Sequence, residues 1–348
     1  MKMSDTPRKN VLSLQLDPKL FESASEEEKQ QQVNLRPSVS FFRDAMKRLS
    51  KNRIAMICLC LIVIISLIAA IVPSVYPYTY SQQDVTRKNM APFQYSAKEQ
   101  AKIDKGEKIF PHIMGTDSLG RDYAIRVIYG TRISLLVGLV ASVIVVVIGI
   151  LYGSISGYFG GRVDLIMMRI VDIIYSLPDV LIIILLSVAI RDFVATSTNE
   201  LILKLGSGMI SIFIVFGLLY WVGMARQVRG QILSIKEQEY VLYARSCGAS
   251  ASRIIRKHMI PNCVSVIIIT AALQIPSAIF TESFLSFLGL GVSIPMPSLG
   301  SLASEARQSL VSYPFLLVYP ATTIFLIVLS FNLLGNGLRD AFDPKLRS

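Results

Sequence analysis

The sequence predicts an all-α membrane protein with six helices that cross the bilayer. Hydrophobic residues make up 52% of the 348 positions and the mean hydropathy is +0.53, which is too apolar for a soluble domain with a solvated surface. A spanning helix needs about 20 predominantly apolar residues. Six stretches approach that length, roughly 54–72, 133–155, 166–190, 209–224, 264–279 and 315–334.

These stretches divide the chain into a polar tail, a first span, a long loop and a core. The first apolar stretch follows a long polar segment and no small-residue cleavage site comes after it, so we interpret it as a retained span and not a signal peptide. Residues 1 to about 40 are polar and mixed in charge, and we expect them to be disordered or loosely helical. The predicted parts are a tail at 1–53, a first span at 54–75, a loop at 76–131, a core of five spans at 132–338 and a tail at 339–348.

Basic residues predict that both termini are cytoplasmic. The start of the first span is crowded by Arg43, Lys47, Arg48, Lys51 and Arg53. Because basic residues favour the cytoplasmic side, the N-terminus should lie inside, and six spans return the C-terminus to the same side. The loop at 76–131 then lies outside, although it carries Arg121, Arg126 and Arg132. Its length weakens the hold of these charges on topology.

The charge and the cysteines point to no other class of protein. A formal net charge of +11 is common in a membrane protein whose basic loops stay inside, and no aromatic and basic module accompanies it to favour nucleic acid. The four cysteines have no zinc-like spacing, so we interpret them as packing residues and expect no metal site.

The outer loop contains a turn punctuated by glycines that leads into a short amphipathic helix. It reads Gly115, Thr116, Asp117, Ser118, Leu119, Gly120, Arg121, Asp122. The two glycines have the spacing of a phosphate-binding loop, but Arg121 and Asp122 stand where such a loop needs Lys and then Ser or Thr. We therefore expect no nucleotide binding by this chain.

Two acidic residues lie in the third stretch. Ionisable groups in a span are functional candidates by default, which makes Asp172 and Asp179 candidates. The structural alternative, which we favour, pairs Asp172 with Arg169 on the same helix face and has Pro178 mark a kink beside Asp179.

A polar and basic segment, 237–262, separates the fourth and fifth spans and has the pattern of a helix, a turn and a helix. In the first helix Tyr240, Val241, Ala244 and Cys247 share one face, and Gly248 ends the helix. Ser250 or Ser252 then caps a second helix, in which one stripe, Ile254, Ile255, His258 and Met259, lies opposite the basic residues Arg253, Arg256 and Lys257. Small residues at the bend would let another protein approach the backbone, which indicates a docking element. The alternative is an ordinary basic loop at the bilayer surface.

The fifth span carries a polar stripe of Thr270, Gln274 and Ser277, with Glu282 near its outer end. In a helix bundle such a stripe faces protein or a water-filled path. We leave open whether it lines a translocation path or bonds to another helix. A hairpin with Gly289, Gly291, Pro295 and Pro297 follows, and it must be buried against protein because its free backbone groups cannot face lipid.

Three motifs in this chain resemble those of ABC-importer permeases of the dipeptide, oligopeptide and nickel subfamily. Residues 115–122 are similar to the GTDxxGRD signature, and residues 282–291 to the ESxLSFLGLG block. Segment 237–262 resembles the cytoplasmic coupling motif, with Ala244, Gly248 and Pro261 at its fixed positions. Glu239 stands where the peptide branch has an acid. Tyr243 and Leu299 depart from the more usual Ala and Trp.

The resemblance implies a C-type subunit with the six-helix type I permease fold. It would move dipeptides or oligopeptides across the bacterial cytoplasmic membrane, in lipid, with a second permease, two cytoplasmic ABC ATPase subunits and an extracytoplasmic peptide-binding protein. ATP and Mg²⁺ would bind to the ATPase subunits, so this chain would hold no cofactor and catalyse no reaction. The expected coupling residues are Glu239, Tyr240, Ala244, Arg245, Gly248, Ala249 and Pro261.

Three alternative interpretations compete with this one. Nickel chelates or other peptide-like solutes use permeases with the same signatures. A self-sufficient secondary transporter would need matching broken segments in its two halves, and none is evident. An intramembrane hydrolase would need a catalytic set at membrane depth, but there is no HExxH motif and His112 and His258 fall in loops.

Overall fold

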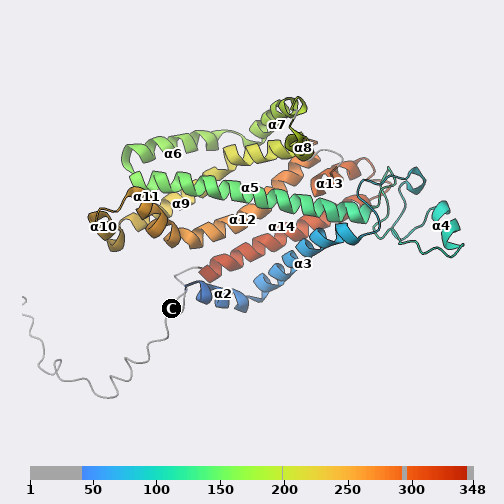
Figure 1. Ribbon diagram of the computed structural model, residues 1–348, viewed down its shortest axis with the longest axis horizontal. Helices are drawn as coiled ribbons and strands as arrows, with labels where there is room; N and C mark the ends of the chain where they lie inside the picture. Colours follow the sequence, from blue (N-terminus) through green and yellow to red (C-terminus); the bar gives the residue numbers. More distant parts are fainter. Residues whose placement is uncertain (1–40, 198, 292–295, 343–348) are drawn as a thin grey trace, which may run out of the picture. The chain divides into compact units, whose positions relative to one another are not determined.

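The computed structural model describes residues 41–197, 199–291 and 296–342, and these are almost entirely helical (Figure 1). The helices are α2 (Phe41–Lys51), α3 (Arg53–Val75), η2 (Val85–Arg87), α4 (Ala97–Ile103), α5 (Tyr123–Phe159), α6 (Gly161–Ser176), α7 (Asp179–Ala195), α8 (Glu200–Val215), η3 (Phe216–Tyr220), α9 (Trp221–Lys236), α10 (Glu239–Ser246), α11 (Ala251–Ile254), η4 (Ile255–Met259), α12 (Ile260–Phe287), α13 (Leu299–Arg307) and α14 (Phe315–Phe342). Within the described ranges the only β contact is a bridge between Thr116 and Asp122.

The chain divides into two compact units, Met1–Met46 and Lys47–Ser348. Of the first unit only the beginning of α2 belongs to the described residues, so the expectation for residues 1–40 lies outside them. The second unit contains every candidate span, together with the signature at 115–122 and segment 237–262.

Five helices in the described part are long and apolar enough to cross a membrane, and a bent pair supplies a sixth. The five are Arg53–Val75, Tyr123–Phe159, Gly208–Lys236, Ala251–Phe287 and Phe315–Phe342. The pair, Gly161–Ser176 and Val180–Ile190, meets at an angle of 87°. The predicted all-α membrane fold is therefore confirmed, but the third span is not one straight helix. Pro178 disfavours helical backbone at Leu177, which adopts φ −76° and ψ 136°.

Two predicted boundaries differ from those in the structure. The short helix predicted after the signature and the span predicted from residue 132 are one helix, α5, which begins at Tyr123. The carboxylate of Asp122 accepts a hydrogen bond from the backbone N–H of Ile125 at 3.0 Å and caps it. Helix α14 continues to Phe342, past the predicted start of the tail at 339, and residues 343–348 lie outside the described ranges.

Helices α5 and α9 approach each other closely because one face of α5 carries glycines at every fourth position. A Cβ atom on Gly153 would stand 2.4 Å from the carbonyl oxygen of Ala225, and one on Gly149 would stand 2.5 Å from Met224. A Cβ atom on Gly157 would stand 2.8 Å from the side chain of Ile232. Small residues at this spacing let two membrane helices pack backbone to backbone.

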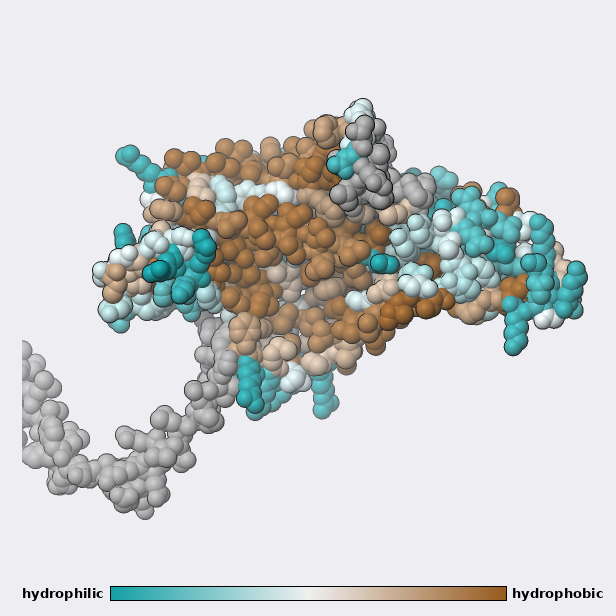
Figure 2. All heavy atoms as spheres, viewed as in Figure 1, coloured by the Kyte–Doolittle hydropathy of each residue, from teal (hydrophilic) through white to brown (hydrophobic). Residues whose placement is uncertain are grey.

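Polar surface gathers at both ends of this second unit. Figure 2 shows apolar side chains over the middle of the helices and hydrophilic ones over α10 and α11 at one end and over the loop around α4 at the other. Near the α4 end, a cluster of buried side chains joins α12, α13 and α14, and Leu299 is fully buried within it. Leucine therefore fits the core at this position.

Candidate functional site

Segment 237–262 folds as α10, a tight turn, α11 and the π-helical turn η4, and it continues directly into α12. Three of its apolar side chains, Val241, Ile254 and Met259, are buried in the main core cluster. This burial fixes the segment to the helix bundle. Because η4 leads into α12 without a break, a displacement of the segment would be transmitted to that span.

The turn between α10 and α11 depends on glycine. Gly248 has φ +79°, a left-handed conformation that favours glycine, and its N–H donates to the carbonyl of Arg245 at 3.0 Å. The next N–H, from Ala249, donates to the carbonyl of Ala244 at 3.1 Å. A Cβ atom at Gly248 would meet nothing within 4 Å in this chain. The backbone at the turn is therefore open to another molecule.

The predicted coupling residues lie together on this element. Five are exposed, Glu239, Tyr240, Arg245, Gly248 and Pro261, and two are partly buried, Ala244 and Ala249. Tyr243 is 73% exposed on the outer side of α10.

Of the two buried helix faces predicted in segment 237–262, the second agrees with the structure and the first agrees only in part. In the second helix the apolar stripe is turned inward and Arg253, Arg256 and Lys257 are exposed, as predicted. In the first helix the buried face is narrower than predicted, because Tyr240 and Cys247 are exposed and only Val241 is fully buried. Ser250 occupies the cap position of α11, but its side chain makes no capping hydrogen bond.

A pocket of about 580 Å³ lies where α10 joins the bundle. It is lined by Tyr158 and Lys236 from the ends of α5 and α9, by Val241 and Arg245 from α10, and by Ile254 from α11. Segment 237–262 and the short turn at Gly160 thus lie at the same end of the bundle.

The signature at 115–122 builds a buried charge network at the other end. The Asp117 carboxylate accepts hydrogen bonds from Arg121 at 2.6 Å and from Arg126 at 2.5 Å. Both arginines also donate to Glu305 of α13, Arg126 through two nitrogens at 2.8 and 3.0 Å. This network ties the outer loop to α5 and α13.

The remaining signature residues shape the loop itself. Besides capping α5, Asp122 pairs with His112 at 2.6 Å, and the other ring nitrogen of His112 lies 3.3 Å from Glu99. Gly115 has φ +75° and Gly120 has φ +70°, and a Cβ on either would overlap a backbone carbonyl of the adjacent segment. Thr116 accepts a hydrogen bond from the N–H of Met90 at 2.8 Å. These residues therefore hold the loop against its adjacent segments and against the start of α5.

Glu282 is fully buried and faces serine hydroxyls. Ser134 of α5 donates to it at 2.8 Å and Ser286 at 2.7 Å. Gly291 packs against Ser286 with no room for a side chain, and Gly289 has φ +81°. The end of α12 is thus tied to α5 through Glu282. In the hairpin that follows, Gly289 is exposed and Gly291 is buried, and residues 292–295, with Pro295, lie outside the described ranges.

The predicted polar stripe of α12 is only partly brought together. Thr270 and Gln274 are partly buried and Ser277 is exposed. Glu282 is turned into the protein, away from that surface, and so does not share it.

Ion pairs between α6 and α9 were missed by sequence reasoning. Asp172 pairs with Arg226 at 2.8 Å and not with Arg169, so the predicted partner was wrong. Asp164 accepts two hydrogen bonds from Arg229. The partners are far apart in sequence, and helical periodicity gives no signal for them. Asp179 begins α7, and its side chain lies outside what is described.

No metal site is evident in the described ranges, which contain no group of three or more His, Cys, Asp or Glu side chains able to hold an ion.

Comparisons with known proteins match nearly the whole chain. A family model described as "Binding-protein-dependent transport system inner membrane component" matches residues 146–348, and one described as "N-terminal TM domain of oligopeptide transport permease C" matches residues 40–92. The chain is 40% identical over 328 residues to the oligopeptide transport system permease protein OppC of Bacillus subtilis. The aligned residues make up 94% of this chain and 97% of that protein.

Two further relatives show a similar extent. The dipeptide transport system permease protein DppC of Bacillus subtilis is 43% identical over 313 residues, covering 90% of this chain and 88% of that protein. The oligopeptide transport system permease protein OppC of Escherichia coli is 39% identical over 308 residues, covering 88% of this chain and 92% of that protein.

Proposed function

Because the chain belongs to the family of binding-protein-dependent transport system inner membrane components, we propose that it is a permease subunit of an ATP-driven importer of dipeptides or oligopeptides. The observation that carries this proposal is the similarity to oligopeptide and dipeptide permeases over almost the full length of both chains. The peptide cargo is inferred from those relatives.

The exposed turn at Gly248 supports ATP-driven coupling through partner subunits. A rigid element that is anchored by buried side chains, open at its backbone and continuous with a span has the properties of a lever. ATP binding would close two cytoplasmic ATPase subunits, and this element, docked on one of them, would move with it. The movement would exchange inward-open and outward-open states of the bundle.

The partners and orientation complete the proposal. The chain pairs with a second permease, and an extracytoplasmic binding protein delivers the peptide to the end formed by the loop at 76–122 and α13. Both termini and the coupling element face the cytoplasm of the bacterial cell. ATP and Mg²⁺ are held by the ATPase subunits, and this chain provides the path and the lever. The same machinery would serve nickel chelates or other peptide-like solutes if the binding protein selected them.

Gly248→Leu tests the coupling role, and Gly106→Leu is its matched control. Both glycines are exposed, have positive φ (+79° and +89°) and would meet nothing within 4 Å with a Cβ. Each leucine therefore introduces a similar backbone strain of about 1–2 kcal/mol. Only Gly248 lies on the proposed docking surface, so only Gly248→Leu should hold the ATPase away.

The complex is reconstituted in liposomes with its partners, and peptide uptake and ATPase retention are measured. We expect Gly248→Leu to reduce uptake at least tenfold with normal membrane insertion, and Gly106→Leu to leave uptake within twofold of the wild-type value. Normal uptake and normal ATPase retention in Gly248→Leu would reject the docking role.

A further inference from the structure

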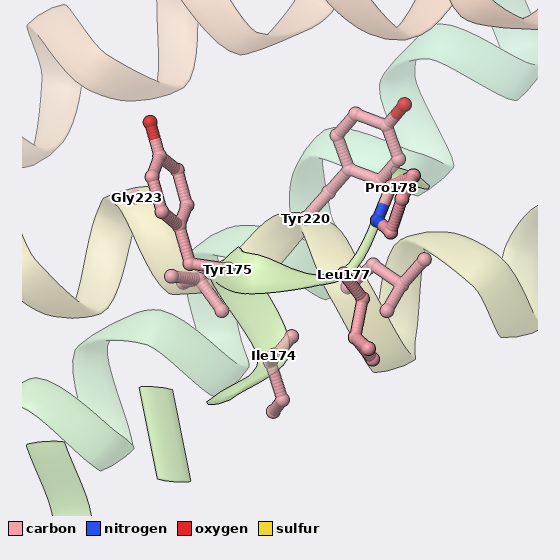
Figure 3. Close-up of a pocket in the computed structure, with 8 residues that line it drawn as sticks. Ile174, Tyr175, Leu177, Pro178, Tyr220 and Gly223 are labelled. Carbon is pink, nitrogen blue, oxygen red and sulfur yellow. The ribbon is translucent and has the colours of Figure 1, made fainter. Parts of the chain in front are cut away.

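A pocket of about 450 Å³ lies at the break between α6 and α7 (Figure 3). The end of α6 contributes Ile174 and Tyr175, the break contributes Pro178, and η3 with the start of α9 contributes Tyr220 and Gly223. In Figure 3 the rings of Tyr175 and Tyr220 extend in the same direction. The pocket thus combines apolar walls with two phenol groups.

An ion pair stands beside this pocket. Arg226 of α9 donates to the carboxylate of Asp172 at 2.8 Å, and its guanidinium lies 4.4 Å from the ring centroid of Tyr175. The side chains of Arg226 and Asp172 are 39% and 55% exposed. Among the described residues the contact uses one oxygen and one nitrogen, which leaves further acceptor and donor positions on both groups.

Asp172 lies at membrane depth, in the third apolar stretch (166–190), and Arg226 reaches it from just beyond the end of the fourth (209–224). Tyr152 of α5 donates to the carbonyl of Met167 at 2.8 Å, and Ser156 donates to Asp164, so the first part of α6 runs beside the end of α5. The apolar stretch of α5 ends near Ser156. Asp172 is eight residues beyond Asp164 (172 − 164), which is about 12 Å along a helix. The hydrocarbon core is about 30 Å thick, so Asp172 stands well inside it.

Exposed charges at this depth do not face lipid. They face a partner protein or a water-filled path, because the cost of burying them in hydrocarbon is high. The chemistry of the pair favours the path. A free peptide carries an ammonium at one end and a carboxylate at the other, and a preformed pair offers an exchangeable counter-charge to each. Binding of this kind is favourable enough for entry and weak enough for release.

We propose that the α6–α7 pocket and its Asp172–Arg226 pair form a transit site for the peptide within the membrane. Asp172 receives the terminal ammonium, Arg226 receives the terminal carboxylate, and the apolar and phenolic walls receive a side chain. This inference rests on the proposed function, since it assigns a site on the path of that cargo.

Thiol accessibility tests the site without requiring transport. A Cβ at Gly223 would meet nothing within 4 Å, so Gly223→Cys is accommodated. The two exposed native cysteines, Cys60 and Cys247, are first replaced by serine. In the whole complex in liposomes we expect a positively charged, membrane-impermeant thiol reagent to modify the introduced group. Trialanine with free termini should slow this reaction at least fivefold, whereas trialanine with an acetylated N-terminus and an amidated C-terminus should not.

Gly230→Cys is the matched control, because Gly230 lies seven residues further along α9 on the same face and also has nothing within 4 Å. Its thiol should react without protection by peptide. An unreactive thiol at position 223, or equal protection by the blocked peptide, would overturn the proposal.

A second measurement separates the path from a subunit interface. Asp172→Asn should lower uptake of the free peptide at least tenfold, while the second permease still copurifies with the chain. Loss of the second permease from this variant would overturn the proposal, because the pair would then be an interface contact. A wild-type complex that imports no peptide, with the protection pattern intact, would instead contradict the proposed function.

Discussion

Replacing Arg126 by methionine should loosen the outer loop while keeping the apolar stem of the side chain. Arg126 is 1% exposed and donates three hydrogen bonds, one to Asp117 at 2.5 Å and two to Glu305 at 2.8 and 3.0 Å. Hydrogen bonds to charged groups contribute about 1.5–3 kcal/mol each. The net loss is smaller than the sum, because Asp117 keeps Arg121 and Glu305 is partly exposed to water. We therefore expect Arg126→Met to lower the free energy of opening of the outer loop by about 3 kcal/mol, which is the low end of the range for a broken buried pair.

Hydrogen exchange measures this loss where it occurs. A change of about 3 kcal/mol in the opening free energy accelerates exchange of amides in residues 84–122 by roughly 100-fold. Lys102→Met is the control, because its contact with Glu107 is 4.0 Å long and exposed, and we expect it to change the opening free energy by less than about 1 kcal/mol. Exchange in Arg126→Met within threefold of the wild-type rate would refute the view that this network holds the loop.

Two further predictions concern packing and pH. Gly153→Leu places a side chain against the carbonyl of Ala225 and should lower the thermal stability of the complex. Gly230→Leu, which has open space around it, should leave that stability unchanged. Equal melting temperatures of the two variants would contradict the α5–α9 contact. Desolvation raises the pKa of Glu99, but hydrogen bonds from Ser96 and the charges of Arg87 and His112 outweigh it and hold that pKa below its ordinary value. The stability that Glu99 contributes is therefore complete above the ordinary carboxyl pKa of about 4.3 and is lost as pH falls through the lowered one. Exchange in the outer loop should accelerate in that acidic range, and Glu99→Gln should remove part of the acceleration.

The spans and the turn at Gly248 could be predicted because their signals are local. Long apolar runs locate helices that cross a bilayer, and a glycine after a short amphipathic helix marks its end. The cap at Asp122 also has a local signal, since an acidic residue before an apolar run is typical of a helix start. A short helix after Asp122 was predicted, but its continuity with the second span as one helix, α5, was not.

The network at Arg126 and the pair at Asp172 could not be predicted because their partners lie on other helices. Arg126 and Glu305 are 179 positions apart, and Asp172 and Arg226 are 54 apart. Helical spacing instead suggested Arg169, the nearest basic residue on the same helix. The 87° bend at Leu177 was likewise only indicated by Pro178, since one proline predicts a break without its angle. Gly149, Gly153 and Gly157 of α5 recur every four residues, but no helix contact was predicted from that spacing.

Cross-linking from Cys247 tests the central claim most directly. This native thiol is exposed and adjoins Gly248 in segment 237–262, the proposed coupling element. In the purified complex, with Cys60 replaced by serine, a photoreactive maleimide attached to Cys247 should join the chain to an ATPase subunit, and the yield should fall with Gly248→Leu. Cross-links to the extracytoplasmic binding protein, or to no protein at all, would contradict the account.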